Sequence, residues 1–234
     1  MLVAGSIAGC AGSDPWREPA ARLLARPTTA DLARLRELSN DPDRDVRALA
    51  LRTLAGLSAA DPEALALERL QDPDAFVRAA AVRLLGERRA VAQLERVADR
   101  LRRDPDPVTR QRAAEALAAI GGGPAIEGLV RGLDDPLATV RAACVGALRV
   151  LRSAEAAAAL ARVLREDGSW EVRAEAAAAL GSTGDPAVAA DLESALADEN
   201  EFVRAAALSA ARELRRALER GPRVPPARAS GAGD

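Results

Sequence analysis

The sequence predicts an all-α protein built from about six stacked two-helix repeats, and two observations carry this prediction. First, an Asp is followed six residues later by an Arg at six places, and successive Arg residues lie 31 or 32 positions apart. Second, the chain is 49% hydrophobic but only 2% aromatic, and Ala fills about a quarter of it. Ala and Leu favour helices, whereas strands prefer aromatic and β-branched residues. Because one helix pair cannot bury its own apolar face, the pairs are expected to stack.

The second helix of each repeat carries the clearest pattern. A Val or Thr lies directly before each repeated Arg, a small residue follows four positions later, and a Leu or Ala follows after four more. These spacings place the three residues on one helix face, which we expect to be buried. The small residue indicates that a neighbouring backbone passes close by. The rows are Val46, Val77, Thr109, Val140, Val172 and Val203; Ala50, Ala81, Ala113, Cys144, Ala176 and Ala207; and Leu54, Leu85, Leu117, Leu148, Leu180 and Ala211.

Weaker apolar segments between these helices are expected to form the first helix of each repeat. Leu94, Val97 and Leu101 show this helical spacing, and similar sets recur in the other repeats. An Asp-Pro pair precedes four of the six second helices. We expect the Asp to cap the helix and the Pro to lie in its first turn. Each repeat is therefore predicted to be two antiparallel helices joined by short turns.

The motif Asp-Pro-x-x-x-Val-Arg-x-x-Ala-x-x-x-Leu, seen from Asp72 to Leu85, resembles the HEAT-like repeat family, especially the short repeats of phycobilisome lyases. The resemblance covers residues 29–220 and implies a right-handed α-solenoid of the armadillo/HEAT type. In that family the Asp and Arg form a ladder that links neighbouring repeats. By position, the ladder falls on Asp41, Asp72, Asp104, Asp135, Asp167 and Asp198, and on Arg47, Arg78, Arg110, Arg141, Arg173 and Arg204.

The two terminal segments differ in composition from the repeats. Residues 7–10, Ile-Ala-Gly-Cys, resemble the lipobox of bacterial lipoproteins, in which the Cys is diacylated. Residues 1–14 are expected to be a truncated lipoprotein-type signal and tether, lipidated at Cys10. Met1 is expected to be a late start, because the basic n-region is missing and the apolar run is short. Residues 15–28 are expected to form a cap, residues 29–220 the solenoid, and residues 221–234 a disordered tail rich in Pro, Gly and Ala.

The residue types that the chain lacks exclude several classes of chemistry. There is no His, which excludes Ser-His-Asp and Cys-His catalysis, His metal sites, and the His-Glu di-iron site of the HEAT-like deoxyhypusine hydroxylases. All 33 basic residues are Arg, so a Walker lysine or a Schiff base is also excluded. A net charge of −2 with few aromatics gives no basic groove or stacking platform for nucleic acid.

A few side chains are candidates for an interaction surface. Phe76, Trp170 and Phe202 lie at the predicted first turn of second helices, where they either contact a partner or fill gaps between repeats. Arg52 and Arg83 make one end of the predicted concave face basic, while the later repeats place small uncharged residues there. The row of six Arg residues is expected to be a structural ladder, with an acidic-ligand surface as the alternative. Cys144 is expected to be a buried, inert thiol.

These features favour a non-enzymatic scaffold that binds a protein or peptide on its concave face. We expect no cofactor, no catalytic or metal site, no nucleic-acid partner, and a monomer that meets a membrane only through Cys10. The expected location is the bacterial cell envelope, or the cytoplasm if Cys10 is not lipidated. The alternative function is a bilin lyase or a chaperone-like protein acting on a protein-bound cofactor. Only the resemblance supports it, and the scarcity of aromatics and the absence of His and Lys weigh against it.

Overall fold

The computed structural model describes residues 31–57 and 62–220. The expected signal and tether with Cys10, the expected cap and the expected tail all lie outside these residues. Within the described ranges there are twelve α-helices, three short 3₁₀-helices and no strand. The predicted all-α solenoid is therefore confirmed. None of the described helices is both long and apolar enough to cross a membrane.

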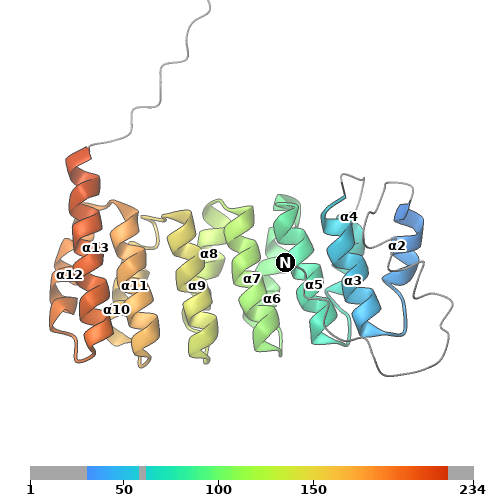
Figure 1. Ribbon diagram of the computed structural model, residues 1–234, viewed down its shortest axis with the longest axis horizontal. Coiled ribbons are helices and arrows are strands. Elements are labelled where there is room, and N and C mark those ends of the chain that lie inside the picture. The colour runs from blue at the N-terminus through green and yellow to red at the C-terminus, as the bar shows by residue number, and fades with distance from the viewer. Residues whose placement is uncertain (1–30, 58–61, 221–234) are drawn as a thin grey trace, which may run out of the picture.

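The helices form six pairs that follow one another along the long axis of the molecule in chain order (Figure 1). The first helices are α2 (Leu32–Leu38), α4 (Pro62–Arg69), α6 (Leu94–Arg103), α8 (Gly123–Gly132), α10 (Ala157–Glu166) and α12 (Ala189–Ser194). The second helices are α3 (Arg44–Ala55), α5 (Ala75–Glu87), α7 (Pro107–Ile120), α9 (Ala138–Leu151), α11 (Trp170–Thr183) and α13 (Glu201–Arg220). The 3₁₀-helices η2 (Val91–Gln93), η3 (Pro186–Val188) and η4 (Ala195–Ala197) flank α6 and α12. The helices α2 and α13 lie at opposite ends of the array (Figure 1).

The second helices begin later than the Asp-Pro pairs predict. In the second repeat the helix starts at Ala75, and its N-cap is Asp74, which accepts a hydrogen bond from the amide of Phe76. Pro73 therefore lies in the turn before the helix and not in its first turn. The leading Asp72 instead accepts a hydrogen bond from the amide of Asp74 and so shapes this turn. The expectation that the leading Asp caps the helix was wrong, because the helix begins at least two residues later, with a second Asp as its N-cap in the first three repeats.

The buried face of each second helix consists of the residues that the spacing selects. All six small residues at mid-helix, including Cys144, are 0% exposed. The Val or Thr before the Arg is also fully buried in five repeats, and Val46 in the first repeat is half-buried. Alternating large and small residues let the helices pack with few gaps.

Successive second helices approach each other very closely. A Cβ built on Gly86 of α5 would lie 2.8 Å from the Cα of Ala116 in α7, and one on Gly181 of α11 would lie 2.7 Å from the Cα of Ala210 in α13. In both pairs, the Gly lies eight residues after the ladder Arg of its own helix, and the Ala lies six residues after the ladder Arg of the next second helix. This contact defines which side of a second helix faces the following repeat and which side faces the preceding one.

Candidate functional site: an arginine–aspartate ladder beside an apolar edge

Five Arg residues pair with the leading Asp of the following repeat. Each guanidinium donates from Nε and Nη2 to the two carboxylate oxygens, at distances of 2.7–3.2 Å. The pairs are Arg47–Asp72, Arg78–Asp104, Arg110–Asp135, Arg141–Asp167 and Arg173–Asp198. Such bidentate pairs fix orientation as well as distance. The ladder therefore sets the register of each repeat against the next.

The same side chains also hold together the turn within each repeat. In all six repeats the Nη1 of the Arg donates to the backbone carbonyl of its own leading Asp, at 2.8–3.0 Å. In all six, one carboxylate oxygen of that Asp accepts the backbone N–H two residues later, at 2.8–3.0 Å. Each turn is thus tied to its own helix and, in five cases, to the preceding repeat.

Three of the ladder carboxylates, those of Asp104, Asp167 and Asp198, have lowered pKa values. Burial alone raises the pKa of Asp104, but the hydrogen bonds from Arg78 and from the Asp106 amide outweigh burial, and the pKa falls below its ordinary value. The same balance lowers the pKa of Asp167. For Asp198 the hydrogen bond from Arg173 is the largest cause of the lowered pKa. A carboxylate that accepts several hydrogen bonds is stabilised as the anion. These groups therefore serve as fixed structural charges.

Beside the ladder turns runs a row of exposed apolar side chains, which we call the apolar edge. Each of the five repeats from the second to the sixth contributes one large apolar residue, at the N-cap or within the first two residues of its second helix. The members and their exposed fractions are Phe76 (50%), Val108 (50%), Leu137 (44%), Trp170 (38%) and Phe202 (57%). Exposed apolar side chains gathered along one edge are typical of an interaction surface. The three aromatic candidates thus lie on one surface.

The C-terminal part of the apolar edge is its most developed section. The rings of Trp170 and Phe202 stack across two repeats, with centroids 5.0 Å apart and an interplanar angle of 29°. A shallow hollow of about 320 Å³ lies beside Trp170. Three exposed carboxylates, those of Glu171, Glu199 and Glu201, belong to the same turns. This section therefore combines aromatic contact area with negative charge.

The exposed face of the second helices is smoother. Between α7 and α9 lies a groove of about 690 Å³ whose walls include Ala118, Ala143, Gly146 and Val150. Nearer the N-terminal end, Arg52 and Arg83 are exposed, as the sequence predicted. Arg83 donates from Nε to Glu87 at 2.6 Å, so its charge is paired locally. The structure thus separates these two arginines from the aromatic residues, which lie at the helix N-termini.

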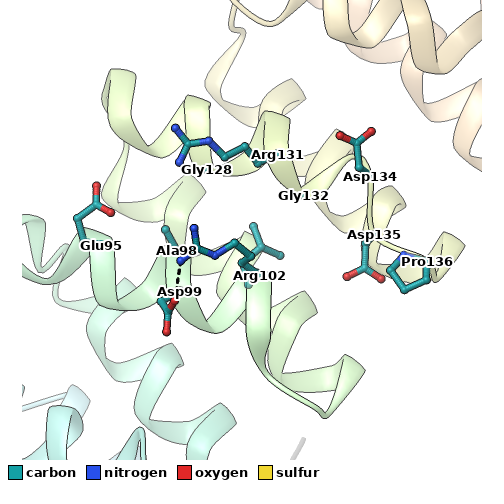
Figure 2. A pocket seen from close by; sticks show the side chains of 11 residues that line it. Glu95, Ala98, Asp99, Arg102, Gly128, Arg131, Gly132, Asp134, Asp135 and Pro136 are labelled. Carbon is teal, nitrogen blue, oxygen red and sulfur yellow. Dashed lines mark hydrogen bonds and ion pairs between the residues drawn. The ribbon is translucent and has the colours of Figure 1, made fainter.

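A second hollow, of about 210 Å³, lies between the first helices α6 and α8 (Figure 2). Gly128 and Gly132 of α8 are among the residues that line it. Its charged side chains include Asp99 and Arg102, which are joined by a hydrogen bond of 2.9 Å. Across residues 31–57 and 62–220, no three Cys, Asp or Glu residues gather as metal ligands.

Comparisons with known proteins agree on the type of repeat. A family model described as HEAT repeats matches residues 32–118 and 126–212, which is most of the chain. The chain belongs to the HEAT-repeat family. A model of the PBS lyase HEAT-like repeat also matches, over residues 109–135. None of the curated proteins matches significantly.

Solved structures of other HEAT and armadillo proteins resemble this solenoid. Escherichia coli YibA is 20% identical with a TM-score of 0.57, and the match covers 88% of this chain and 89% of that one. An archaeal HEAT-like repeat protein from Thermococcus onnurineus is 19% identical with a TM-score of 0.53, over 83% and 82% of the two chains. A designed armadillo repeat protein in complex with a (KR)4 peptide is 21% identical with a TM-score of 0.51, over 79% and 99%. At these identities the likeness establishes the fold alone.

Within the HEAT repeats, Cys144 takes the place of an alanine. Its thiol is 0% exposed, and burial raises its pKa to about 12. A Cβ built on Gly132 of the facing helix would lie 2.5 Å from its Sγ. The larger Cys side chain is therefore accommodated by the missing side chain of Gly132.

Two members of the apolar edge were missed by sequence reasoning. Val108 and Leu137 are aliphatic, and aliphatic residues are assigned to the core unless their turn geometry is known. Both lie in the few residues between the leading Asp and the repeated Arg, as Phe76 does. That shared position was the signal that could have found them.

Proposed function

We propose that this chain is a non-enzymatic scaffold of the bacterial envelope whose apolar edge binds a protein partner. The observation that carries the proposal is the apolar edge itself: five consecutive repeats each expose a large apolar side chain two to four residues after the leading Asp. Water-exposed apolar area of this kind is stabilised when a partner covers it. The lipobox-like residues 7–10 support attachment to the envelope through a lipid at Cys10.

The chemistry around Trp170 and Phe202 favours a partner segment that is both apolar and basic. An Arg or Lys side chain of the partner would find aromatic faces to stack on and the carboxylates of Glu171 and Glu201 to pair with, whereas Glu199 already pairs with Arg173 at 3.2 Å. Trp and Phe are also rigid anchors that lose little conformational entropy on binding. The ladder supports this role because it holds the edge residues at a fixed spacing.

The experiment compares the full chain with two triple variants in affinity capture from envelope extracts. The edge variant carries Phe76→Ser, Trp170→Ser and Phe202→Ser. The matched control carries Val91→Ser, Val150→Ser and Leu196→Ser, three apolar residues that are 68%, 70% and 41% exposed elsewhere. Circular dichroism melting shows that both variants are folded.

The proposal expects a protein that is retained by the wild type and by the control variant but is lost by the edge variant. Loss of the same protein from both variants would mean that non-specific hydrophobic binding, and not the apolar edge, explains its retention. A set of captured proteins identical for all three chains would refute the edge as a binding surface.

A further inference from the structure

The last rung of the ladder is half complete. Arg204 donates to the backbone carbonyls of Asp198 and Glu199, as its counterparts do in the other repeats. Its Nε and Nη2, however, have no carboxylate among the described residues, because no further repeat follows α13 there. Arg204 is exposed, whereas the five paired arginines have side chains only 8–17% exposed. In each of the five other repeats these two guanidinium nitrogens bind an Asp, whereas in Arg204 they bind no described carboxylate.

The apolar surface next to Arg204 is open in the same way. Four positions after the ladder Arg, five repeats carry a residue that is 0% exposed: Leu51, Val82, Ala114, Val145 and Ala177. In the last repeat this position is Leu208, which is 43% exposed. The side of α13 on which another repeat would pack therefore keeps its apolar character without cover.

The opposite end of the array has the complementary features. The carboxylate of Asp41 accepts the Asp43 amide but has no Arg among the described residues. The residue six positions after the ladder Arg faces the preceding repeat. It is buried in five repeats, but its equivalent in the first repeat, Thr53, is half-buried. Leu49 on the same helix is 37% exposed. Among the described residues, the α3 end thus presents the Asp half of a rung together with partly exposed apolar surface.

The charges of the two ends are also opposite. On α13 the exposed Arg204, Arg212 and Arg215 form no ion pair with any described residue. The turn at the start of α3 carries Asp41, Asp43 and Asp45, of which Asp45 lies 3.8 Å from Arg44. Opposite charges at complementary apolar surfaces favour a defined contact and suppress others. An Arg at position 212 is compatible with a repeat packed against α13. The equivalent residue of α9, Arg149, donates a hydrogen bond to Glu175 of the next repeat at 2.9 Å.

We propose that a second copy of this chain docks head to tail, with Arg204 of one copy pairing with Asp41 of the next to form a further rung of the ladder. Leu208 of the first copy is covered by the α3 end of the second. This contact is heterologous, so each bound copy leaves a free α3 end or α13 end for another. The proposal departs from the monomer expected from the sequence, and it is independent of the apolar edge, which lies at the helix N-termini along the array.

The test uses a charge swap in the full chain under reducing conditions. Sedimentation velocity over a range of concentrations should show the wild-type mass rising above that of one chain. Arg204→Asp and Asp41→Arg, each alone, should remain monomeric, because each variant brings two like charges together. An equal mixture of the two should regain association. In that mixture the two substituted ends carry opposite charges, and the native Arg204 of one variant still meets the native Asp41 of the other.

A second variant guards against local unfolding of the turn at Asp41. Leu208→Asp places a charge on the exposed apolar surface of α13 and should also abolish association, with an unchanged circular dichroism melt. Phe202→Ser alters the apolar edge and should leave association unchanged. The proposal is overturned if the wild type stays monomeric at every concentration. It is also overturned if either charge variant associates as the wild type does, or if the mixture stays monomeric while both components are folded.

Discussion

The sharpest test of the ladder compares the same substitution at an internal rung and at the open first one. Asp104 accepts two hydrogen bonds from Arg78, at 2.9 and 2.8 Å, one from the Asp106 amide at 3.0 Å, and a longer one from Arg100 at 3.5 Å. Asp104→Asn removes the negative charge and leaves the buried guanidinium of Arg78 with a neutral partner. Breaking a buried ion pair costs about 3–5 kcal/mol. Because the Asn amide oxygen still accepts one bond, we expect a loss at the lower end of that range, about 3 kcal/mol.

Asp41→Asn is the matched control. It keeps an acceptor for the Asp43 amide and disrupts no arginine pair among the described residues. Its expected cost is under about 1 kcal/mol, the worth of weakening one hydrogen bond. The measurement is urea unfolding at neutral pH followed by circular dichroism. Hydrogen exchange of α5 and α7 locates the loss, because repeat arrays can unfold locally. Equal losses for the two variants would refute the view that the pair with Arg78, and not the turn, gives Asp104 its importance.

Three further predictions address packing, pH and the membrane. Gly132→Ala should destabilise the wild type by about 1–3 kcal/mol in thermal unfolding, because the added Cβ meets the Sγ of Cys144. The same substitution should cost much less in a Cys144→Ala background. An equal cost in both backgrounds would rule out this contact. Because the folded-state pKa values of Asp104, Asp167 and Asp198 are lowered, their stabilisation is complete above their unfolded pKa of 3.8 and is lost as pH falls through the folded values. Acid titration of the unfolding free energy should therefore show a drop below about pH 4 that is smaller in Asp104→Asn; a drop of the same size in this variant would contradict it. Expressed in bacteria behind a complete lipoprotein signal, the chain should incorporate labelled palmitate and lose it on Cys10→Ser but not on Cys144→Ala; an unlabelled wild type would exclude the anchor.

The spacing of residues predicts the fold because the fold depends on local periodicity. A Val, a small residue and a Leu at four-residue intervals select the buried face whatever lies on the far side of it. The ladder was expected from the resemblance to HEAT-like repeats, and five bidentate pairs between successive repeats are found. The exact start of each helix was missed, because Asp72 and Asp74 are both competent caps and only the folded turn decides between them.

The surface features are less predictable because exposure depends on neighbours. Leu208 and Leu51 occupy the same position of the repeat, yet only the first is exposed, since the helix that covers Leu51 has no counterpart beyond α13 among the described residues. In the same way Val108 resembles a core residue until the turn before α7 directs it outward. Sequence periodicity identifies the side of a helix, while the order of repeats decides whether that side meets protein or water.

The ladder and the apolar edge are parts of one physical arrangement. Each ladder Asp fixes the turn that precedes a second helix, and the residue that the edge exposes comes two to four positions later in the chain. The bidentate pairs therefore hold the edge residues in place at the spacing of the repeats. A partner that binds across several repeats meets a surface whose order has already been established by folding. Binding to such a surface loses less conformational entropy than binding to mobile loops, so even a few apolar contacts stabilise the complex. The regularity that makes the sequence recognisable as a repeat is thus also what prepares its edge for recognition.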